Sequence, residues 1–277
     1  MRVGVSPWGT SLAGVKRVAA AAEAARVDTL WLGDGLLVVP DFPQWSGGLE
    51  PFAELAWLAG RHPSLAIGVG AAVLPLRDPL YVAKQAATLD QLTEGRFFLV
   101  VTPGIWEREF AFRGLSFKAR GTRFDEFIRV VRAAFAGEPF AGEQVTLPPD
   151  GRLSPVPFTV GGPPLWLAGG RPTFERALRH GLGFQARTTP PSAFAATARE
   201  WFDRGGGDLA MRIALQVADA VVESDDALAG PPAYLTEQLA AYRDLGLADV
   251  SLMPGRDDAT SLRTLEALAE EILPALR

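Results

Sequence analysis

The sequence predicts an α/β protein that folds as a single (β/α)8 TIM barrel over residues 1–277, and three observations support this fold class. Short β-branched or apolar runs alternate with amphipathic helical patterns, which is typical of a parallel sheet covered by helices. About eight strand–helix units can be counted, whereas an open doubly wound sheet usually needs about five or six strands. The length of 277 residues is also close to the roughly 250 residues that are typical of this barrel.

The strands are expected at eight places along the chain, in this order: 2–7, 29–34, 65–73, 96–102, 164–169, 183–187, 211–219 and 249–255. The helices between them should each bury one face, because apolar residues recur with a period of about 3.6. In the first helix these residues are Val15, Val18, Ala22 and Ala25, and in the last they are Leu262, Leu265, Ala269, Ile272 and Leu276. Residues 137–163 are rich in Pro and Gly and too polar for a core element, so we expect a long excursion between the fourth and fifth strands.

Composition excludes several classes of function. The formal net charge is -5 and the arginines are scattered, so we expect no nucleic-acid partner. The absence of cysteine excludes disulfides, thiolate catalysis and zinc-thiolate sites, and no apolar run approaches the ~20 residues that a membrane span needs. We therefore expect a cytoplasmic protein with no membrane partner.

The scarcity of histidine and lysine narrows the chemistry further. The only histidines are His62, before a strand, and His180, within a helix, which disfavours both a histidine metal cluster and a Ser-His-Asp triad. The only lysines, Lys16, Lys84 and Lys118, fall on predicted helices away from strand ends. A Schiff-base lysine is disfavoured, because it would have to project into the pocket.

In a TIM barrel the loops that follow the strands carry the chemistry. This rule selects Trp8, Asp34-Gly35, residues 71–73, residues 102–106, residues 169–171, residues 187–188 and Met253. Residues 67–73, "IGVGAAV", imitate the start of a dinucleotide-binding fingerprint. We discard that interpretation, because the glycines lie inside a strand and Val73 replaces the third glycine.

The segment "LWLAGGRPTFERALRHG" is the most informative of the strand ends. A strand ends in Gly169-Gly170, and a helix follows with Pro172 near its first position. Glycines let the backbone approach a ligand, the helix N-terminus offers free N–H groups, and Arg171 adds a cation, so a phosphate site is predicted. An ordinary tight turn between strand and helix is the competing interpretation.

Two other features also have an ordinary alternative. Asp34 could orient a cofactor or accept a proton at the mouth of the barrel, but Asp-Gly is equally a common turn signal. Trp8, Trp45 and Trp106 could wall a pocket for a flat ring, although most tryptophans only fill a core.

Five segments together resemble the luciferase-like monooxygenase superfamily, in the branch that includes oxidoreductases dependent on the deazaflavin coenzyme F420. The segments are 22–34, 65–104, 109–138, 163–184 and 270–277, and the helix "LYVAKQAATLDQL" with its flanking strands is the most specific part. The resemblance implies a barrel that holds FMN or coenzyme F420 with its ring across the strand ends, and relatives of this kind are often homodimers.

The resemblance also implies roles for particular residues. Asp34 and Thr102 would contact the cofactor, and a bulge in the third strand would support the ring through a non-prolyl cis peptide, which matches Ala72–Val73 here. The phosphate would contact Gly169, Gly170 and Arg171. Trp8 and Trp106 would bound the pocket of a small organic substrate.

Two departures from the family pattern affect the expected chemistry. Deazaflavin enzymes of the family commonly have Ser-Asp-His where this chain has Gly33-Asp34-Gly35, and the fourth strand ends in residues 101–105, "VTPGI", instead of a Gly-x-Gly motif. No catalytic acid or base is therefore assigned. The short segment between Asp219 and Pro231, where relatives often carry an insertion, predicts a more open cleft.

Three functions remain open at this point. The first is hydride transfer or monooxygenation of a small organic substrate with F420 or FMN. The second is a barrel that binds a flavin-like ligand without turnover or that has lost the cofactor. A phosphosugar enzyme is more remote, because Asp34 alone would have to serve a strand-end acid role.

Overall fold

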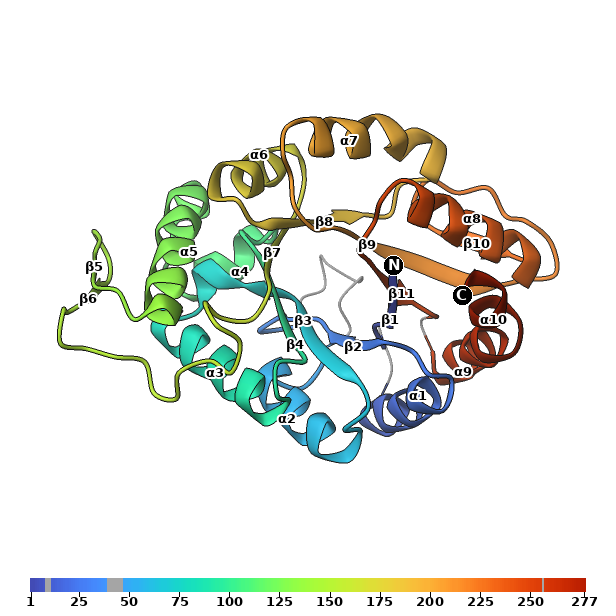
Figure 1. The fold of residues 1–277 in the computed structure, drawn as a ribbon, viewed down its shortest axis with the longest axis horizontal. Coiled ribbons are helices and arrows are strands. Elements are labelled where there is room, and N and C mark those ends of the chain that lie inside the picture. Colours follow the sequence, from blue (N-terminus) through green and yellow to red (C-terminus); the bar gives the residue numbers. More distant parts are fainter. Residues whose placement is uncertain (8–10, 39–46, 256) are drawn as a thin grey trace.

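A closed parallel barrel forms the centre of the molecule. The computed structural model describes residues 1–7, 11–38, 47–255 and 257–277. Eight strands follow one another around the ring and the last closes on the first (Figure 1). They are β1 (Arg2–Val5), β2 (Thr29–Leu32), β3 (Ala66–Val73), β4 (Phe97–Thr102), β7 (Leu165–Ala168), β8 (Gly183–Arg187), β9 (Leu209–Val217) and β11 (Asp249–Met253). The predicted TIM barrel and each of its eight strands are confirmed.

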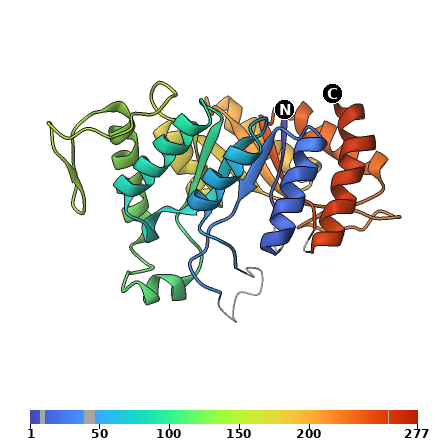
Figure 2. The ribbon, with the colours of Figure 1, turned by 90° about the horizontal axis from the view of Figure 1, so that it is seen from below.

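Helices surround the barrel on all sides (Figures 1 and 2). The long ones are α1 (Leu12–Ala24), α2 (Pro51–Arg61), α3 (Pro79–Leu92), α5 (Arg120–Ala136), α6 (Arg171–His180), α7 (Pro191–Asp203), α8 (Pro232–Asp244) and α9 (Asp258–Ala267). The short ones are η1 (Leu74–Leu76), α4 (Glu107–Phe112), η2 (Leu268–Ile272) and α10 (Leu273–Leu276). In α1 the predicted residues Val15, Val18 and Ala22 are buried against the sheet.

The last helix keeps most of the predicted buried face, since Leu265, Ile272 and Leu276 are buried as expected. Residues 268–272 form a π-helical turn, which adds a residue to the helical repeat. Leu268 and Leu273 are buried as well, whereas Ala269, which the prediction placed inside, is only half-buried.

The excursion predicted for residues 137–163 is confirmed. It contains only the small antiparallel pair β5 (Phe140–Ala141) and β6 (Thr146–Leu147). The fully buried Asp90 of α3 holds its far end, since the carboxylate accepts the N–H of Thr159 at 2.7 Å and its hydroxyl at 3.0 Å. A third short strand outside the ring, β10 (Leu228–Gly230), pairs with β9.

Aromatic side chains fill the lumen of the barrel. Trp31, Phe98 and Trp166 pack together with ring centroids 5.5–5.9 Å apart. Glycines make room for them, because a Cβ on Gly68 would lie 2.3 Å from Trp31 and one on Gly183 would lie 2.1 Å from Trp166. The lumen is thus a packed core, and any ligand must bind above it at the strand ends.

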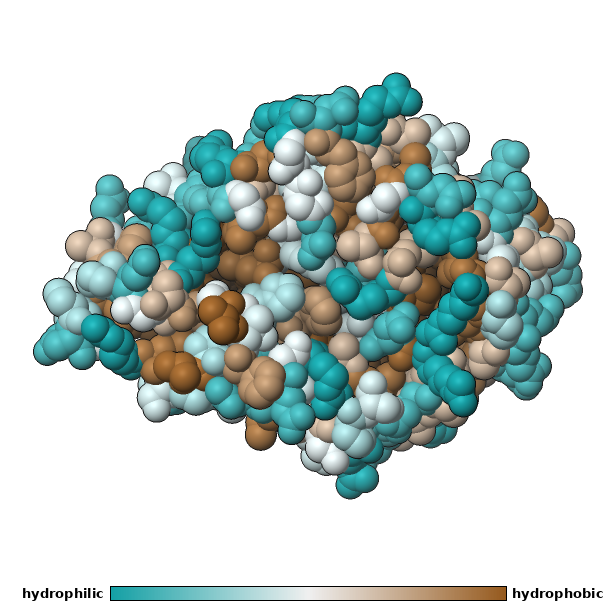
Figure 3. All heavy atoms as spheres, in the orientation of Figure 1, coloured by the Kyte–Doolittle hydropathy of each residue, from teal (hydrophilic) through white to brown (hydrophobic). Residues whose placement is uncertain are grey.

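The two ends of the barrel differ in what covers them. In Figure 2 the N-terminus and the start of β1 lie at the upper edge, and the loops that follow the strands lie at the lower edge. Figures 1 and 3 look onto the end where the strands begin, and there hydrophilic side chains line most of the rim while hydrophobic ones gather toward the middle. No helix of the described chain is long and apolar enough to span a membrane.

Candidate functional site

A bulge in β3 shapes the centre of the strand-end face. The pairing of β3 with β4 shifts register between Gly70 and Ala72, and the peptide bond Gly70–Ala71 is cis. The predicted bulge is therefore present, but the prediction of a cis bond at Ala72–Val73 was wrong. The extra residue resets the in–out alternation of the strand. Ala71 consequently lines the cavity, while Ala72 is fully buried in the core between the sheet and the helices.

Asp34 anchors the end of this bulge. Its carboxylate accepts the backbone N–H of Val73 at 2.9 Å and two hydrogen bonds from Arg77, at 2.9 and 2.7 Å. Arg77 also pairs with Glu50 at 2.9 Å. The aspartate therefore orients the backbone on which a ring would rest, and its charge is balanced by a bidentate arginine.

Arg212 of β9 holds the other end of the bulge. Its guanidinium donates to the carbonyl of Gly70 at 2.6 Å and to the Ser6 hydroxyl at 3.0 Å. Burial lowers the pKa of Arg212 to about 10. The sequence reasoning missed this residue, although a single charge inside the apolar run "MRIALQV" was a usable signal.

Glu109 is a second residue that the sequence reasoning missed. It lies in the first turn of α4, is 4% exposed, and accepts the N–H of Leu36 at 2.7 Å. Burial raises the pKa of its carboxyl above the ordinary value, and the nearby charge of Asp34 raises it further. Among the described residues, Glu109 and Asp34 are the acids that line the cavity beside the bulge.

The cavity runs across the strand ends from β2 to β9 and has a volume of about 240 Å³. Of the predicted site residues, it brings together Asp34, Val73, Thr102, Trp106 and Gly169. Gly170 and Arg171 do not line it. Trp8 and Trp45 lie outside the described residues.

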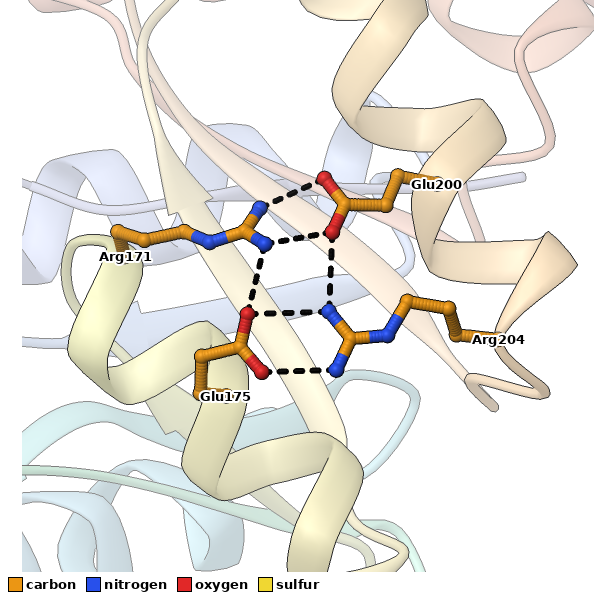
Figure 4. A network of polar contacts seen from close by, with 4 residues as sticks. All are labelled: Arg171, Glu175, Glu200 and Arg204. Atoms are coloured by element: carbon orange, nitrogen blue, oxygen red, sulfur yellow. Dashed lines mark hydrogen bonds and ion pairs between the residues drawn. The ribbon is translucent and has the colours of Figure 1, made fainter.

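Arg171 takes part in an ion network on the surface of α6 and α7. Its guanidinium contacts Glu200 at 2.6 and 2.5 Å and Glu175 at 2.7 Å, and Arg204 completes the four-residue set (Figure 4). Hydrogen bonds from Arg171 and Arg204 lower the pKa of Glu200 to about 2. To contact a phosphate, Arg171 would have to leave these carboxylates, so its predicted role stays a prediction.

Gln185 of β8 supplies the most unusual polar group of the cavity. It is 3% exposed, and its amide nitrogen has no hydrogen-bond partner within the described part of the chain. A buried donor without a partner is costly and usually marks a position that a ligand or water satisfies. The sequence signal was a lone polar residue in the buried strand "GFQAR".

The cavity fits a flat ligand with a polar edge. Small residues at the bulge leave room for a ring, and Gln185 offers a donor. Before α6 there is open space at Gly170, since a Cβ there would meet nothing within 4 Å. Across residues 1–7, 11–38, 47–255 and 257–277, no group of three or more His, Asp or Glu side chains is arranged to hold a metal ion.

The family model "Luciferase-like monooxygenase" matches residues 2–205. The chain belongs to the luciferase-like monooxygenase family. This family of flavin- or F420-dependent oxidoreductases is the one indicated by the sequence segments around the bulge and the glycine turn.

Curated relatives match over part of their length. An uncharacterized protein of Mycobacterium tuberculosis is 33% identical over 120 residues, which cover 41% of this chain and 42% of that protein. The oxygenase component of the flavin-dependent trigonelline monooxygenase of Acinetobacter baylyi is 26% identical over 139 residues, covering 49% of this chain and 39% of the relative. The chain thus spans less than half the length of these relatives.

Solved structures of luciferase-like proteins share the whole fold. The monooxygenase RslO1 from Streptomyces bottropensis has a TM-score of 0.86 at 20% identity and covers 100% of both chains. The oxygenating constituent of 3,6-diketocamphane monooxygenase from Pseudomonas putida, in complex with FMN, has a TM-score of 0.79 at 16% identity, with 99% and 98% covered. An F420-dependent secondary alcohol dehydrogenase with an F420-acetone adduct has a TM-score of 0.80 at 17% identity, with 100% and 99% covered.

Proposed function

We propose that this luciferase-like protein is an oxidoreductase that binds FMN or coenzyme F420 and acts on a small organic substrate by hydride transfer or monooxygenation. The observation that carries the proposal is the cavity above the β3 bulge, in which small residues at the strand ends face the partnerless amide of Gln185. Such a coenzyme would supply the redox chemistry, and the protein would bind and orient it.

Different residues at the strand ends would hold the ring and the phosphate of the coenzyme. The bulge, held by Asp34 on one side and Arg212 on the other, would form a rigid floor for the ring. Gly169 and Gly170, at the N-terminus of α6, would receive the phosphate on free backbone N–H groups. Trp106 and Thr102 would cover the face of the ring on the side of β4, with Trp106 toward the substrate.

The test is a fluorescence titration of the apo-protein with FMN and with F420, in the wild type and in Gly170→Glu. The wild type should bind one of them in the micromolar range or tighter, and the new carboxylate should weaken that binding by about tenfold or more, because it repels the phosphate at the helix N-terminus. Gly207→Glu is the matched control, since a Cβ there also meets nothing within 4 Å and the site lies on the turn before β9. Absence of binding to both coenzymes would refute the proposal.

A barrel that holds a flavin without turnover is a second candidate, and one observation favours it. Of the two acids that line the described cavity, Asp34 is paired with Arg77 and Glu109 is buried against a backbone N–H. Reduction of the bound coenzyme by light or dithionite, followed by exposure to oxygen and to a set of carbonyl acceptors, separates the two candidates. A coenzyme that binds but is reoxidised by none of them would favour the second.

A further inference from the structure

A second cavity adjoins the proposed ring site. It has a volume of about 720 Å³ and lies between β8, β9, β11 and the segment 218–227. Ile105, Arg187 and Arg212 line both cavities, so a molecule in the second would lie beside a ring in the first. Gly169 does not line it, which places this space away from the proposed phosphate turn.

Two arginines stand side by side on its wall. Arg187 and Arg212 are register partners on β8 and β9, and both side chains line the cavities. The Arg212 guanidinium contacts Gly70 and Ser6. The side chain of Arg187, by contrast, makes no hydrogen bond or ion pair with the residues that the structure describes. It is the cation at the boundary of the two cavities that can turn to a ligand.

The acids of the second cavity do not neutralise this cation. The carboxylate of Asp257 caps α9, where it accepts the N–H of Thr260 at 2.8 Å and its hydroxyl at 2.9 Å. Asp226 lies on the exposed segment 218–227. On the same face of β8 as Arg187, two residues earlier, the buried amide of Gln185 adds a second partnerless donor.

We propose that Arg187 binds an oxyanion of the substrate, a carboxylate or an enolate, in the second cavity. This inference rests on the proposed function and assigns its substrate class: a small organic acid or acidic carbonyl compound held beside the ring. A guanidinium provides paired N–H donors that match the two oxygens of a carboxylate. A phosphate on the coenzyme is the other possible source of an oxyanion, and the test separates the two.

The test uses isothermal titration calorimetry with the coenzyme-loaded protein and a panel of carboxylates, acetate to benzoate, each paired with its neutral primary amide. In the wild type, at least one carboxylate should bind about tenfold or more tightly than its amide, as a charge-assisted pair requires. Arg187→Gln should abolish that preference and Arg187→Lys should keep part of it. Arg199→Gln, at an exposed arginine of α7, is the charge-matched control and should change nothing.

Each other outcome contradicts the inference. If no carboxylate is preferred over its amide, or if the preference survives in Arg187→Gln, Arg187 does not bind a substrate oxyanion. The phosphate of the coenzyme is the other possible oxyanion at Arg187. It is tested by titrating Arg187→Gln with FMN and with riboflavin, which differ only in the phosphate. A selective loss of FMN affinity would assign Arg187 to the coenzyme and overturn the inference. If the wild type binds neither coenzyme, the proposed function is refuted. The carboxylate panel is then titrated into the apo-protein, and the same comparison of wild type with Arg187→Gln decides whether Arg187 binds an oxyanion.

Discussion

At the scale of the residue, side chains in this site have partners that cannot be predicted from their positions in the sequence. Asp34 was expected at the ring, and it lines the cavity, but its carboxylate is used by Val73 and Arg77. Arg171 sits beside the glycine turn as expected, yet its guanidinium is shared by two glutamates of α6 and α7. The buried amide of Gln185, by contrast, has no hydrogen-bond partner among the described residues.

Gln185→Leu should affect the free and the loaded protein in opposite ways. The apo-protein should become more stable by about 1 kcal/mol, because a buried amide without a partner is replaced by an apolar group of similar size. Coenzyme affinity should fall by about fivefold to tenfold, the value of one hydrogen bond. Urea unfolding of the apo-protein and coenzyme titration measure the two effects. An unchanged affinity would show that Gln185 does not contact the ligand.

At the scale of the element, β3 combines a bulge with glycines that accommodate the aromatic core. Gly68 and Gly70 face Trp31, and the bulge begins directly after Gly70. The glycine pattern that imitated a nucleotide fingerprint thus has a packing explanation. It lets a tryptophan from the neighbouring strand fill the lumen beneath the cavity.

Gly68→Ala should destabilise the protein by about 1–3 kcal/mol, because the added methyl group lies 2.3 Å from a Trp31 ring carbon in a packed lumen. Gly60→Ala is the control, since a Cβ at this position of α2 meets nothing within 4 Å. That control should be neutral or stabilising by up to about 1 kcal/mol, because alanine favours helix more than glycine does. Equal midpoints of urea unfolding for the two variants would contradict this account of β3.

At the scale of the whole molecule, the two ends of the barrel serve different purposes. The end where the strands finish carries the cavities. At the other end, Arg2 lies over Phe98 at 4.6 Å and donates to the fully buried Asp249 at 3.2 Å, where the first and last strands of the ring pair. Burial raises the pKa of Asp249 to about 7, against the opposing influence of Arg2.

This carboxyl should make stability depend on pH in a defined direction. Because its folded pKa lies above the unfolded value, the folded state binds the extra proton, and stability is lost as the pH rises from about 4 through about 7. Asp249→Asn removes this titration. Its free energy of unfolding relative to the wild type should therefore rise between pH 5 and pH 8, by on the order of 2 kcal/mol. A difference that stays constant over this range, measured by urea unfolding, would exclude the raised pKa.

The sequence by itself determined the barrel, its eight strands, the excursion of residues 137–163 and the strand ends at which a site could lie. These features depend on local periodicity and turn residues, which a linear chain displays directly. The tertiary structure alone decided that the cis bond lies at Gly70–Ala71 and that Arg212 reaches the carbonyl of Gly70 from 142 residues away. It also decided that Arg171 is paired with Glu200, whereas Gln185 and Arg187 face the cavities. The reason is that closure of the ring sets the partners of these charged and polar groups, because it brings β8 and β9 opposite β3. Local sequence patterns do not show which distant strands come to face each other.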